Sequence, residues 1–320
     1  MRFKIENTGF YAPPRIETAQ DLSDRVGRSE QWILSRTGVA ERRISDEPMS
    51  VMGAKAARQA LGDGPPPDLI LNASLTPMQL IPDSSIFIQK ELGFSGIPSF
   101  SIHATCMSFL VALHTAGHLM QGGAYKRILI VSAEQGSVSR DMTHPESAAL
   151  IGDGAAAALL VPTPEGEASE CLAFHQSSWP EGSDLAEFRG AGTRQHPNDP
   201  STRFEDNVFR MRGPRIYKMT VPKVQAMIAS LLDKAGWSPE DVDTVIPHQA
   251  SMRGVLALDR AGFHPDQVVN IVGSYGNTIA ASIPMTLAHA HHTSRLKRGD
   301  KVIIVGMGAG LHVAGALLLW

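Results

Sequence analysis

Phe100-Ser-Ile-His-Ala-Thr-Cys106-Met-Ser-Phe-Leu-Val-Ala-Leu-His-Thr-Ala-Gly-His-Leu-Met120 is the stretch around which the chain is organised. The short apolar run over 99–102 predicts a buried strand, and apolar residues at helical spacing follow from Met107 onward. Cys106 is therefore expected where a strand passes into a helix. The N–H groups and positive dipole end of a helix N-terminus favour a thiolate, which is the reactive form of a cysteine nucleophile. On this stretch alone, Cys106 could equally well be a small hydrophobic residue buried in the core.

The composition is that of an ordinary globular protein. Of 320 residues, 43% are hydrophobic and 19% charged, and the balance of 29 Lys and Arg against 32 Asp and Glu leaves a net charge of -3. This balance argues against nucleic acid or a membrane surface as a partner. Cys106 and Cys171 are too few for a disulfide framework, and no run has the length of a membrane-spanning helix. We therefore expect a cytoplasmic protein.

Helix caps and breakers predict the order of elements. Thr18 and Ser29 are expected to cap two helices, and Gly38 to end the second of them. Strands are expected near residues 2–10, 69–72, 127–131 and 155–161. The polar segment 162–206 is rich in Gly, Pro and Ser, so we interpret it as the connection between two halves.

The second half of the chain repeats the first. Asp68-Leu-Ile-Leu is echoed by Asp243-Thr-Val-Ile, Gly93-Phe94 by Gly262-Phe263, and the strand at Arg127 by the one at Lys301, at offsets of 169 to 175 residues. Three echoes at nearly one offset predict a duplicated βαβ-type unit. We place the halves at residues 1–165 and 166–320.

The duplication predicts a composite site. Cys106, His248 and Asn277 each follow a predicted strand, and equivalent strand ends of the two units are expected at the same edge of their sheets. Taken singly, His248 is more often a structural histidine and Asn277 a turn residue. As a set with a cysteine, they indicate a catalytic centre.

These motifs closely resemble the β-ketoacyl-acyl-carrier-protein synthase III family of thiolase-fold condensing enzymes over essentially the whole chain. The resemblance rests on Cys106, His248-Gln-Ala-Ser-Met-Arg253, Tyr275-Gly-Asn277-Thr-Ile-Ala-Ala-Ser-Ile-Pro284, Gly306-Met-Gly-Ala-Gly310, Trp32-Ile-Leu-Ser-Arg36-Thr-Gly-Val-Ala-Glu-Arg42-Arg and Gly152-Asp-Gly-Ala-Ala-Ala-Ala-Leu-Leu160. It implies an α/β thiolase fold, in which two pseudo-symmetric βαβαβ-type halves form a five-layered αβαβα architecture, and it implies a homodimer.

The resemblance also implies a mechanism. Cys106 takes an acyl group from an acyl-CoA or acyl carrier protein, and His248 Nε2 and the Asn277 amide donate to the thioester oxygen of a malonyl-CoA or malonyl-acyl carrier protein extender. Backbone N–H groups of Cys106 and Ala309 form the oxyanion hole. A neutral amide suits an enolate, which favours carbon–carbon bond formation. The alternative is an acyltransferase or specialised-metabolite ketosynthase that moves or joins acyl chains without malonyl decarboxylation.

Substrate-binding residues follow from the same resemblance. Trp32 and Arg36 match positions that hold the adenine end of coenzyme A, Met307 lies in the glycine-rich turn, and Ile81 stands where an aromatic residue shortens the acyl pocket. A smaller residue there predicts a medium- or long-chain primer. Arg253 and a basic cluster are expected to receive the phosphopantetheine phosphate or an acidic carrier protein, the cluster being Arg210, Arg212, Arg215 and Lys218.

The sequence departs from the family pattern at several points. Ile-His-Ala-Thr precedes Cys106 in place of alanines, Met-Ser-Phe follows it in place of Ala-Gly-Phe, and residues 143–147 include no arginine to complete the adenine site. Gly306-Met-Gly-Ala-Gly310 lacks the helix, strand and acid that a dinucleotide site needs before the chain ends. His289, His291 and His292 have no Cys or acidic partner at ligand spacing, so we expect a solvated helical face, with no metal and no cofactor beyond the coenzyme A thioester substrates.

Overall fold

Two β-sheets form the frame of the molecule, and the computed structural model describes residues 1–320. The first sheet has five strands in the order β1-β7-β6-β4-β5, and the second has four in the order β11-β12-β13-β8. Their bounds are β1 Phe3–Tyr11, β4 Leu69–Asn72, β5 Ser99–Ser101, β6 Ile128–Glu134, β7 Gly154–Pro162, β8 Glu170–Ser178, β11 Thr244–Pro247, β12 Lys301–Gly308 and β13 His312–Leu319.

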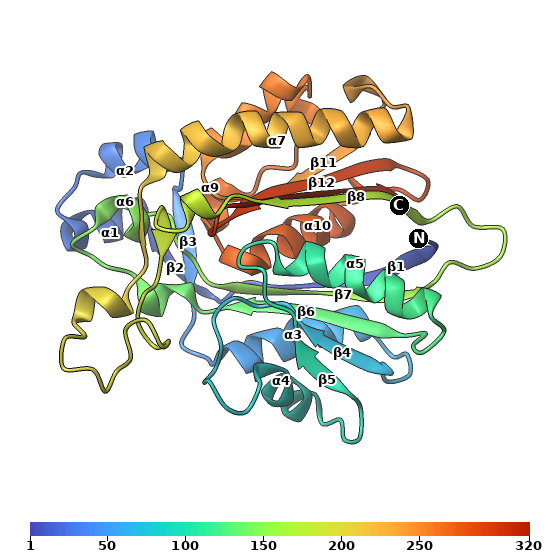
Figure 1. Ribbon diagram of the computed structural model, residues 1–320, viewed down its shortest axis with the longest axis horizontal. Coiled ribbons are helices and arrows are strands. Elements are labelled where there is room, and N and C mark those ends of the chain that lie inside the picture. Colours follow the sequence, from blue (N-terminus) through green and yellow to red (C-terminus); the bar gives the residue numbers. More distant parts are fainter.

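Helices cover both sheets, so that five layers alternate between helix and sheet (Figure 1). The outer layers hold α3 and α4 on one side and α7 and α8 on the other, while α5 and α10 lie between the sheets. The bounds are α3 Met49–Leu61, α4 Ser84–Leu92, α5 Ser108–Gln121, α7 Gly213–Ala235, α8 Met252–Leu256 and α10 Ser282–His292. The largest core cluster, of 33 buried residues, includes side chains of both sheets and of these two central helices.

The predicted duplication is confirmed by the strand orders. Each sheet contains a parallel pair, β4 with β6 or β11 with β12, that continues on one side into antiparallel strands, and β5 adds a second parallel pair with β4 in the first sheet. The order β1-β7-β6-β4 in the first sheet therefore matches β8-β13-β12-β11 in the second. The predicted boundary at residue 165 falls in the link between β7 and β8.

Smaller elements gather at one end of the layers, at the left of Figure 1. The predicted caps are confirmed: Thr18 Oγ1 accepts the N–H of Asp21 (3.1 Å), and Ser29 Oγ accepts that of Trp32 (3.2 Å). Gly38 ends its helix at a φ of 73°. These elements are β2 Arg15–Thr18, α1 Ala19–Val26, α2 Glu30–Thr37, β3 Glu41–Ile44, α6 Pro145–Ala148, β9 Ala186–Glu187, β10 Arg210–Met211 and α9 Val272–Tyr275.

Two predictions about strands are wrong. The run over 99–102 is not buried: β5 is the edge strand of its sheet, and Phe100 is 41% exposed. The predicted connection 162–206 contains β8, the edge strand of the second sheet. An edge strand with one face toward solvent carries many polar residues, which explains why its composition resembles that of a linker.

Candidate active site

Cys106 lies in the turn that leads from β5 into α5. The N–H of Met107 donates to Ala104 O (3.0 Å), and the N–H of Ser108 donates to Thr105 O (3.1 Å). Cys106 keeps partial exposure, whereas Met107 and Ser108 are fully buried. The turn is therefore anchored by its neighbours in the core, and Cys106 is the least buried of these three residues.

Burial dominates the electrostatics of the cysteine. Burial, and after it the carboxyl of Glu134, raises the pKa of the Cys106 thiol to about 12. The backbone N–H groups of Ala309 and of Cys106 itself lie against the sulfur and oppose this rise. The expectation that the helix N-terminus favours a thiolate is therefore wrong for the free site, because desolvation of a buried anion outweighs the helix dipole.

The end of β12 packs directly against this turn. A Cβ built on Gly308 would meet Thr105 Oγ1 at 2.5 Å and the backbone nitrogen of Cys106 at 3.3 Å. One built on Gly306 would meet His248 Cβ at 2.9 Å. Glycine is required at both positions because the turn and the residue after β11 approach the same stretch of backbone. Residues 306–308 thus bring the surroundings of Cys106 and His248 together.

His248 follows β11 and is only 6% exposed. Burial lowers the pKa of its imidazole to about 4, so the ring is neutral near pH 7. Its Nδ1 atom is buried and has no hydrogen-bond partner. A neutral imidazole has one N–H donor and one lone pair, so this side chain can donate to a developing anion or accept a proton.

Asn277 is held beside the His248 loop. Its Nδ2 donates to Ala250 O at 3.5 Å, and its Oδ1 accepts the N–H of Ile279 at 2.9 Å. The backbone N–H of Asn277 also donates to Leu150 O (2.7 Å). Because Oδ1 is occupied by a donor, the amide orientation leaves its NH₂ group as the part available to a ligand.

Sequence reasoning missed Glu134, which ends β6 and is fully buried. Its carboxylate accepts the N–H groups of Leu75 and of Thr76, the latter at 3.2 Å. A backbone hydrogen bond from Ala280 reaches it as well, and burial raises its pKa to about 7. Glu134 thus ties the loop after β4 to the loop that follows Asn277. An acid at the end of the apolar run 128–134 is the signal that could have identified it.

We predict that Glu134→Gln changes how stability depends on pH. The native carboxyl holds its proton up to about pH 7, whereas the unfolded chain releases it near pH 4.5. The free energy of unfolding of the wild type should therefore fall as pH rises through this window, by about 3 kcal/mol. The free energy of unfolding can be measured by urea denaturation between pH 4.5 and 8. The decline should be absent in Glu134→Gln and should remain in Glu240→Gln, which alters an exposed carboxyl. A parallel decline in both variants would contradict the assignment.

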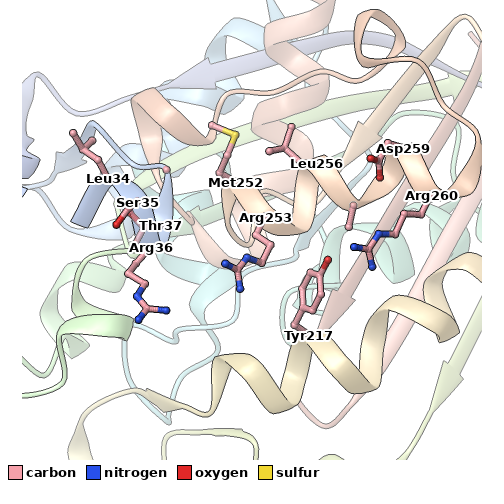
Figure 2. A pocket seen from close by; sticks show the side chains of 12 residues that line it. Leu34, Ser35, Arg36, Thr37, Tyr217, Met252, Arg253, Leu256, Asp259 and Arg260 are labelled. Carbon is pink, nitrogen blue, oxygen red and sulfur yellow. The ribbon is translucent and has the colours of Figure 1, made fainter. Parts of the chain in front are cut away.

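A separate cavity of about 480 Å³ lies between α2, α7 and α8. Arg36 and Arg253 line it together with Arg260, and Tyr217 extends from α7 toward them (Figure 2). None of these three arginines forms an ion pair, and Asp259 is the one acidic residue in the lining. The cavity is therefore positively charged.

Trp32 lies near this cavity on α2. The Arg28 guanidinium lies over its ring, with Cζ 5.5 Å from the ring centroid. Residues 143–147 include no arginine, yet the Arg28 guanidinium stacks on Trp32 from the turn that precedes α2. Arg28 was not singled out from the sequence because its spacing from Trp32 matches any exposed helix pair.

The predicted basic cluster is only partly free. Arg210 pairs with Asp141 (2.7 Å) and Arg212 with Asp184 (3.2 Å), so the charge of each is already partly neutralised. Of the four residues, Arg215 and Lys218 form no ion pair and remain the better candidates for a receiving surface. The acids that neutralise two of them are distant in sequence, so the pattern of basic residues alone could not reveal the pairing.

Two predicted substrate-binding residues lie away from the cysteine within this chain. Ile81 is 84% exposed and lines no part of the interior. Met307 packs against the core cluster beneath α7, on the face of β12 opposite to Gly306 and Gly308. Strand alternation explains the second case, because successive side chains point to opposite faces.

The expected solvated face at the end of α10 is also wrong in part. His291 Nδ1 and His292 Nε2 contact Thr8 Oγ1 at 2.9 and 3.2 Å, and the His291 ring packs edge-on against Trp320. These histidines therefore anchor α10 to β1. No group of three or more His, Cys, Asp or Glu side chains is arranged to hold a metal ion. No helix is long and apolar enough to cross a membrane.

Comparisons with known proteins identify the family. The family model for 3-oxoacyl-[acyl-carrier-protein] synthase III matches residues 100–180, and the model for its C-terminal part matches 232–320. The β-ketoacyl-[acyl-carrier-protein] synthase III of Aquifex aeolicus is 35% identical over 325 residues, covering 100% of this chain and 99% of the relative.

Solved structures agree as well. The crystal structure of the Aquifex aeolicus synthase III has a TM-score of 0.90 at 33% identity and covers 99% of this chain and 100% of its own. A priming β-ketosynthase from a polyketide biosynthetic pathway has a TM-score of 0.91 at 28% identity, with 99% and 96% covered.

The five-layered fold and the polar groups at its strand ends define a thiolase-fold condensing enzyme, an enzyme of the acyltransferase type that acts on acyl thioesters. The sequence matches extend over the whole length of the chain. The chain belongs to the β-ketoacyl-[acyl-carrier-protein] synthase III family.

Proposed function

We propose that Cys106 accepts an acyl group from a primer thioester and that this group is then joined to a malonyl extender. The observation that carries the proposal is the close packing of residues 308–309 against the Cys106 turn, where a Cβ on Gly308 would meet the Cys106 backbone nitrogen at 3.3 Å and Thr105 Oγ1 donates to Ala309 O at 3.1 Å. In agreement with this packing, the backbone N–H groups of Ala309 and Cys106 act to lower the pKa of the thiol. An oxyanion formed on a carbonyl bound to that sulfur would be within reach of both donors. The thiol is protonated in the free site, so loading needs a base, and neutral His248 has a lone pair for that purpose.

His248 and Asn277 are proposed to act in the second half of the reaction. Loss of carbon dioxide from the malonyl thioester leaves an enolate, whose oxygen would accept hydrogen bonds from the imidazole N–H and the Asn277 amide. Its carbanion carbon would then attack the acyl carbonyl on Cys106 and release a β-ketoacyl thioester. Burial supports this assignment because hydrogen bonds to a developing anion are strongest in a dry site.

The charged cavity supports delivery of substrate on a carrier. Arg36, Arg253 and Arg260 line it, and the unpaired Arg215 and Lys218 lie on α7 beside Tyr217. Guanidinium groups suit the phosphate of phosphopantetheine and the acidic surface of a carrier protein. We propose acyl-CoA as the primer and malonyl-acyl carrier protein or malonyl-CoA as the extender, with Trp32, backed by Arg28, as a stacking surface for adenine.

Neutralising Arg253 tests this delivery route. Arg253→Gln is expected to raise the KM for malonyl-acyl carrier protein about fivefold to tenfold, because an unpaired cation facing an acidic partner is lost. Arg212→Gln is the matched control, since Arg212 is already paired with Asp184, and should change this KM less than twofold. Steady-state kinetics in low salt measure both values. Equal effects of the two variants would contradict the proposed docking surface.

We also propose a homodimer and a medium- or long-chain primer. An association along β5 is supported by its edge position and by the exposed Phe100, Leu80 and Ile81, at 41%, 71% and 84%. Ile81, exposed in its own chain, would then limit the acyl site of the second copy. Sedimentation velocity measures the association.

We also propose a cytoplasmic location, which the two free cysteines support.

Intact-protein mass spectrometry tests the proposed function. Offered a mixture of acetyl-CoA and octanoyl-CoA, the protein should accumulate the octanoyl adduct first, and a malonyl thioester should then discharge it as a β-keto product. Faster acetyl loading would contradict the chain-length proposal alone. Discharge to a hydroxyl or amine acceptor, with no response to malonyl thioesters, would identify an acyltransferase instead.

A further inference from the structure

Thr105, the residue before the nucleophile, has a backbone conformation that its side chain disfavours. Its φ is 51°, in the left-handed region, where a β-branched residue is a genuine outlier. Such conformations cost on the order of 1–3 kcal/mol and persist only where surrounding contacts enforce them. The contacts made by Thr105 therefore need a functional explanation.

The Thr105 hydroxyl reaches across to the loop after β12. Its Oγ1 donates to Ala309 O at 3.1 Å, linking two residues 204 positions apart in the chain. Ala309 lies outside any strand or helix, and no backbone N–H donates to its carbonyl. Thr105 is thus the side chain that fixes the residue whose N–H faces the Cys106 sulfur.

A second hydroxyl supports the first. Ser108 Oγ donates to Thr105 O (2.7 Å) and accepts the N–H of Ala104 (2.9 Å). Ser108 is fully buried at the first residue of α5, so it ties Thr105 to a rigid element. We call Thr105 and Ser108 the hydroxyl clamp. It connects the helix, the nucleophile turn and Ala309 in one chain of hydrogen bonds.

We infer that the hydroxyl clamp positions Ala309 as an oxyanion donor, so that Thr105 is a positioning residue for acyl transfer to Cys106. This inference rests on the proposed function. In the step concerned, Cys106 Sγ bonds to the acyl carbon and the carbonyl electron pair moves to oxygen. Return of that pair breaks the bond to the carrier sulfur, which leaves with the proton given up by Cys106. The Ala309 N–H is needed only while the oxygen carries the charge.

Two reactions of the same sulfur separate positioning from a merely structural role. Acylation passes through a tetrahedral oxyanion, whereas alkylation by iodoacetamide displaces iodide without forming one. Thr105→Ala should slow single-turnover acylation by octanoyl-CoA about tenfold, the usual cost of weakening one donor, with KM unchanged within twofold. Alkylation of Cys106 should stay within twofold of wild type.

Variants at the same position keep the test interpretable. Thr105→Ser retains the hydroxyl and should restore acylation to within twofold of wild type. Thr105→Ala relieves a β-branched side chain in the left-handed region but also removes the hydrogen bond to Ala309 O, so its midpoint of urea unfolding should stay close to that of wild type. Thr115→Ala is the matched control, because the Thr115 hydroxyl donates to Val111 O (2.8 Å) in the same helix, away from the site.

Each result decides between the inference and its alternatives. Slower acylation with normal alkylation and rescue by serine supports the hydroxyl clamp. If Thr105→Ala slowed acylation and alkylation equally, Thr105 would only position the sulfur. If acylation were unchanged, the hydrogen bond from Thr105 to Ala309 O would not contribute to the reaction. Either result overturns the inference. If wild-type protein takes up no acyl group, the proposed function itself fails, and that failure is recognised before any variant is compared.

Discussion

Cys106→Ala is expected to abolish acyl loading, with a loss of at least about 10⁴-fold in turnover, as is typical when a covalent nucleophile is removed. The reason is chemical: alanine offers no atom to carry the acyl group between the two half-reactions. The measurement is intact-protein mass spectrometry after incubation with octanoyl-CoA. The wild type should gain one acyl mass, and the variant none.

Cys171 provides the matched control because the chain has one other free cysteine. It is 3% exposed on β8, and burial raises the pKa of its thiol to about 11. Both thiols are therefore suppressed by burial, but Cys171 Sγ donates to Ala173 O and has no pair of backbone N–H groups against it. Cys171→Ala should load normally. If the Cys106→Ala variant were acylated and the Cys171→Ala variant were not, Cys171 would be the nucleophile and the assignment of Cys106 would be wrong.

The fold could be predicted from the sequence because both halves of the chain repeat similar motifs at the ends of equivalent strands. Asp68 and Asp243 precede equivalent strands, and the two sheets then place Cys106, His248 and Asn277 around the end of β12 and the His248 loop. The longer hydrophobic runs, over 128–131 and 155–161, form buried strands, so this level of organisation is encoded locally. The short run over 99–102 is the exception, because β5 lies at the edge of its sheet.

The electrostatics of the site could not be predicted in the same way. A strand-to-helix junction indicated a thiolate at Cys106, yet the degree of desolvation depends on the packing of segments far apart in sequence. Glu134 raises the thiol pKa further, and its approach to Cys106 follows from the sheet and not from spacing. For the same reason the pairing of Arg210 with Asp141 was invisible in the pattern of basic residues.

His248→Ala is expected to separate the two half-reactions. Burial lowers the pKa of His248 to about 4, so at pH 7 the ring is neutral and can donate through Nε2 to an enolate oxygen. Removing one such donor from a dry site costs about 10² to 10³ in rate. Condensation with a malonyl thioester should fall by at least this factor, while the Cys106 adduct should still form, more slowly if His248 also accepts the thiol proton.

The second donor and the pH profile make this prediction sharper. Asn277→Asp replaces an amide donor by a carboxylate of nearly the same shape, so it should repel an enolate and suppress condensation at least as strongly while loading persists.

The pH dependence of stability gives a separate test of His248. The imidazole is protonated below about pH 6.5 in the unfolded chain but only below about pH 4 in the native state. The free energy of unfolding should therefore decrease as pH falls from about 6.5 to about 4. His248→Ala should remove that decrease, and His264→Ala, which alters an exposed histidine, should retain it. Rapid-quench measurement of the Cys106 adduct and of the β-keto product tests the kinetic predictions for His248→Ala and Asn277→Asp. If loading and condensation fell equally in these two variants, His248 and Asn277 would maintain the fold of the site and would not act on the extender.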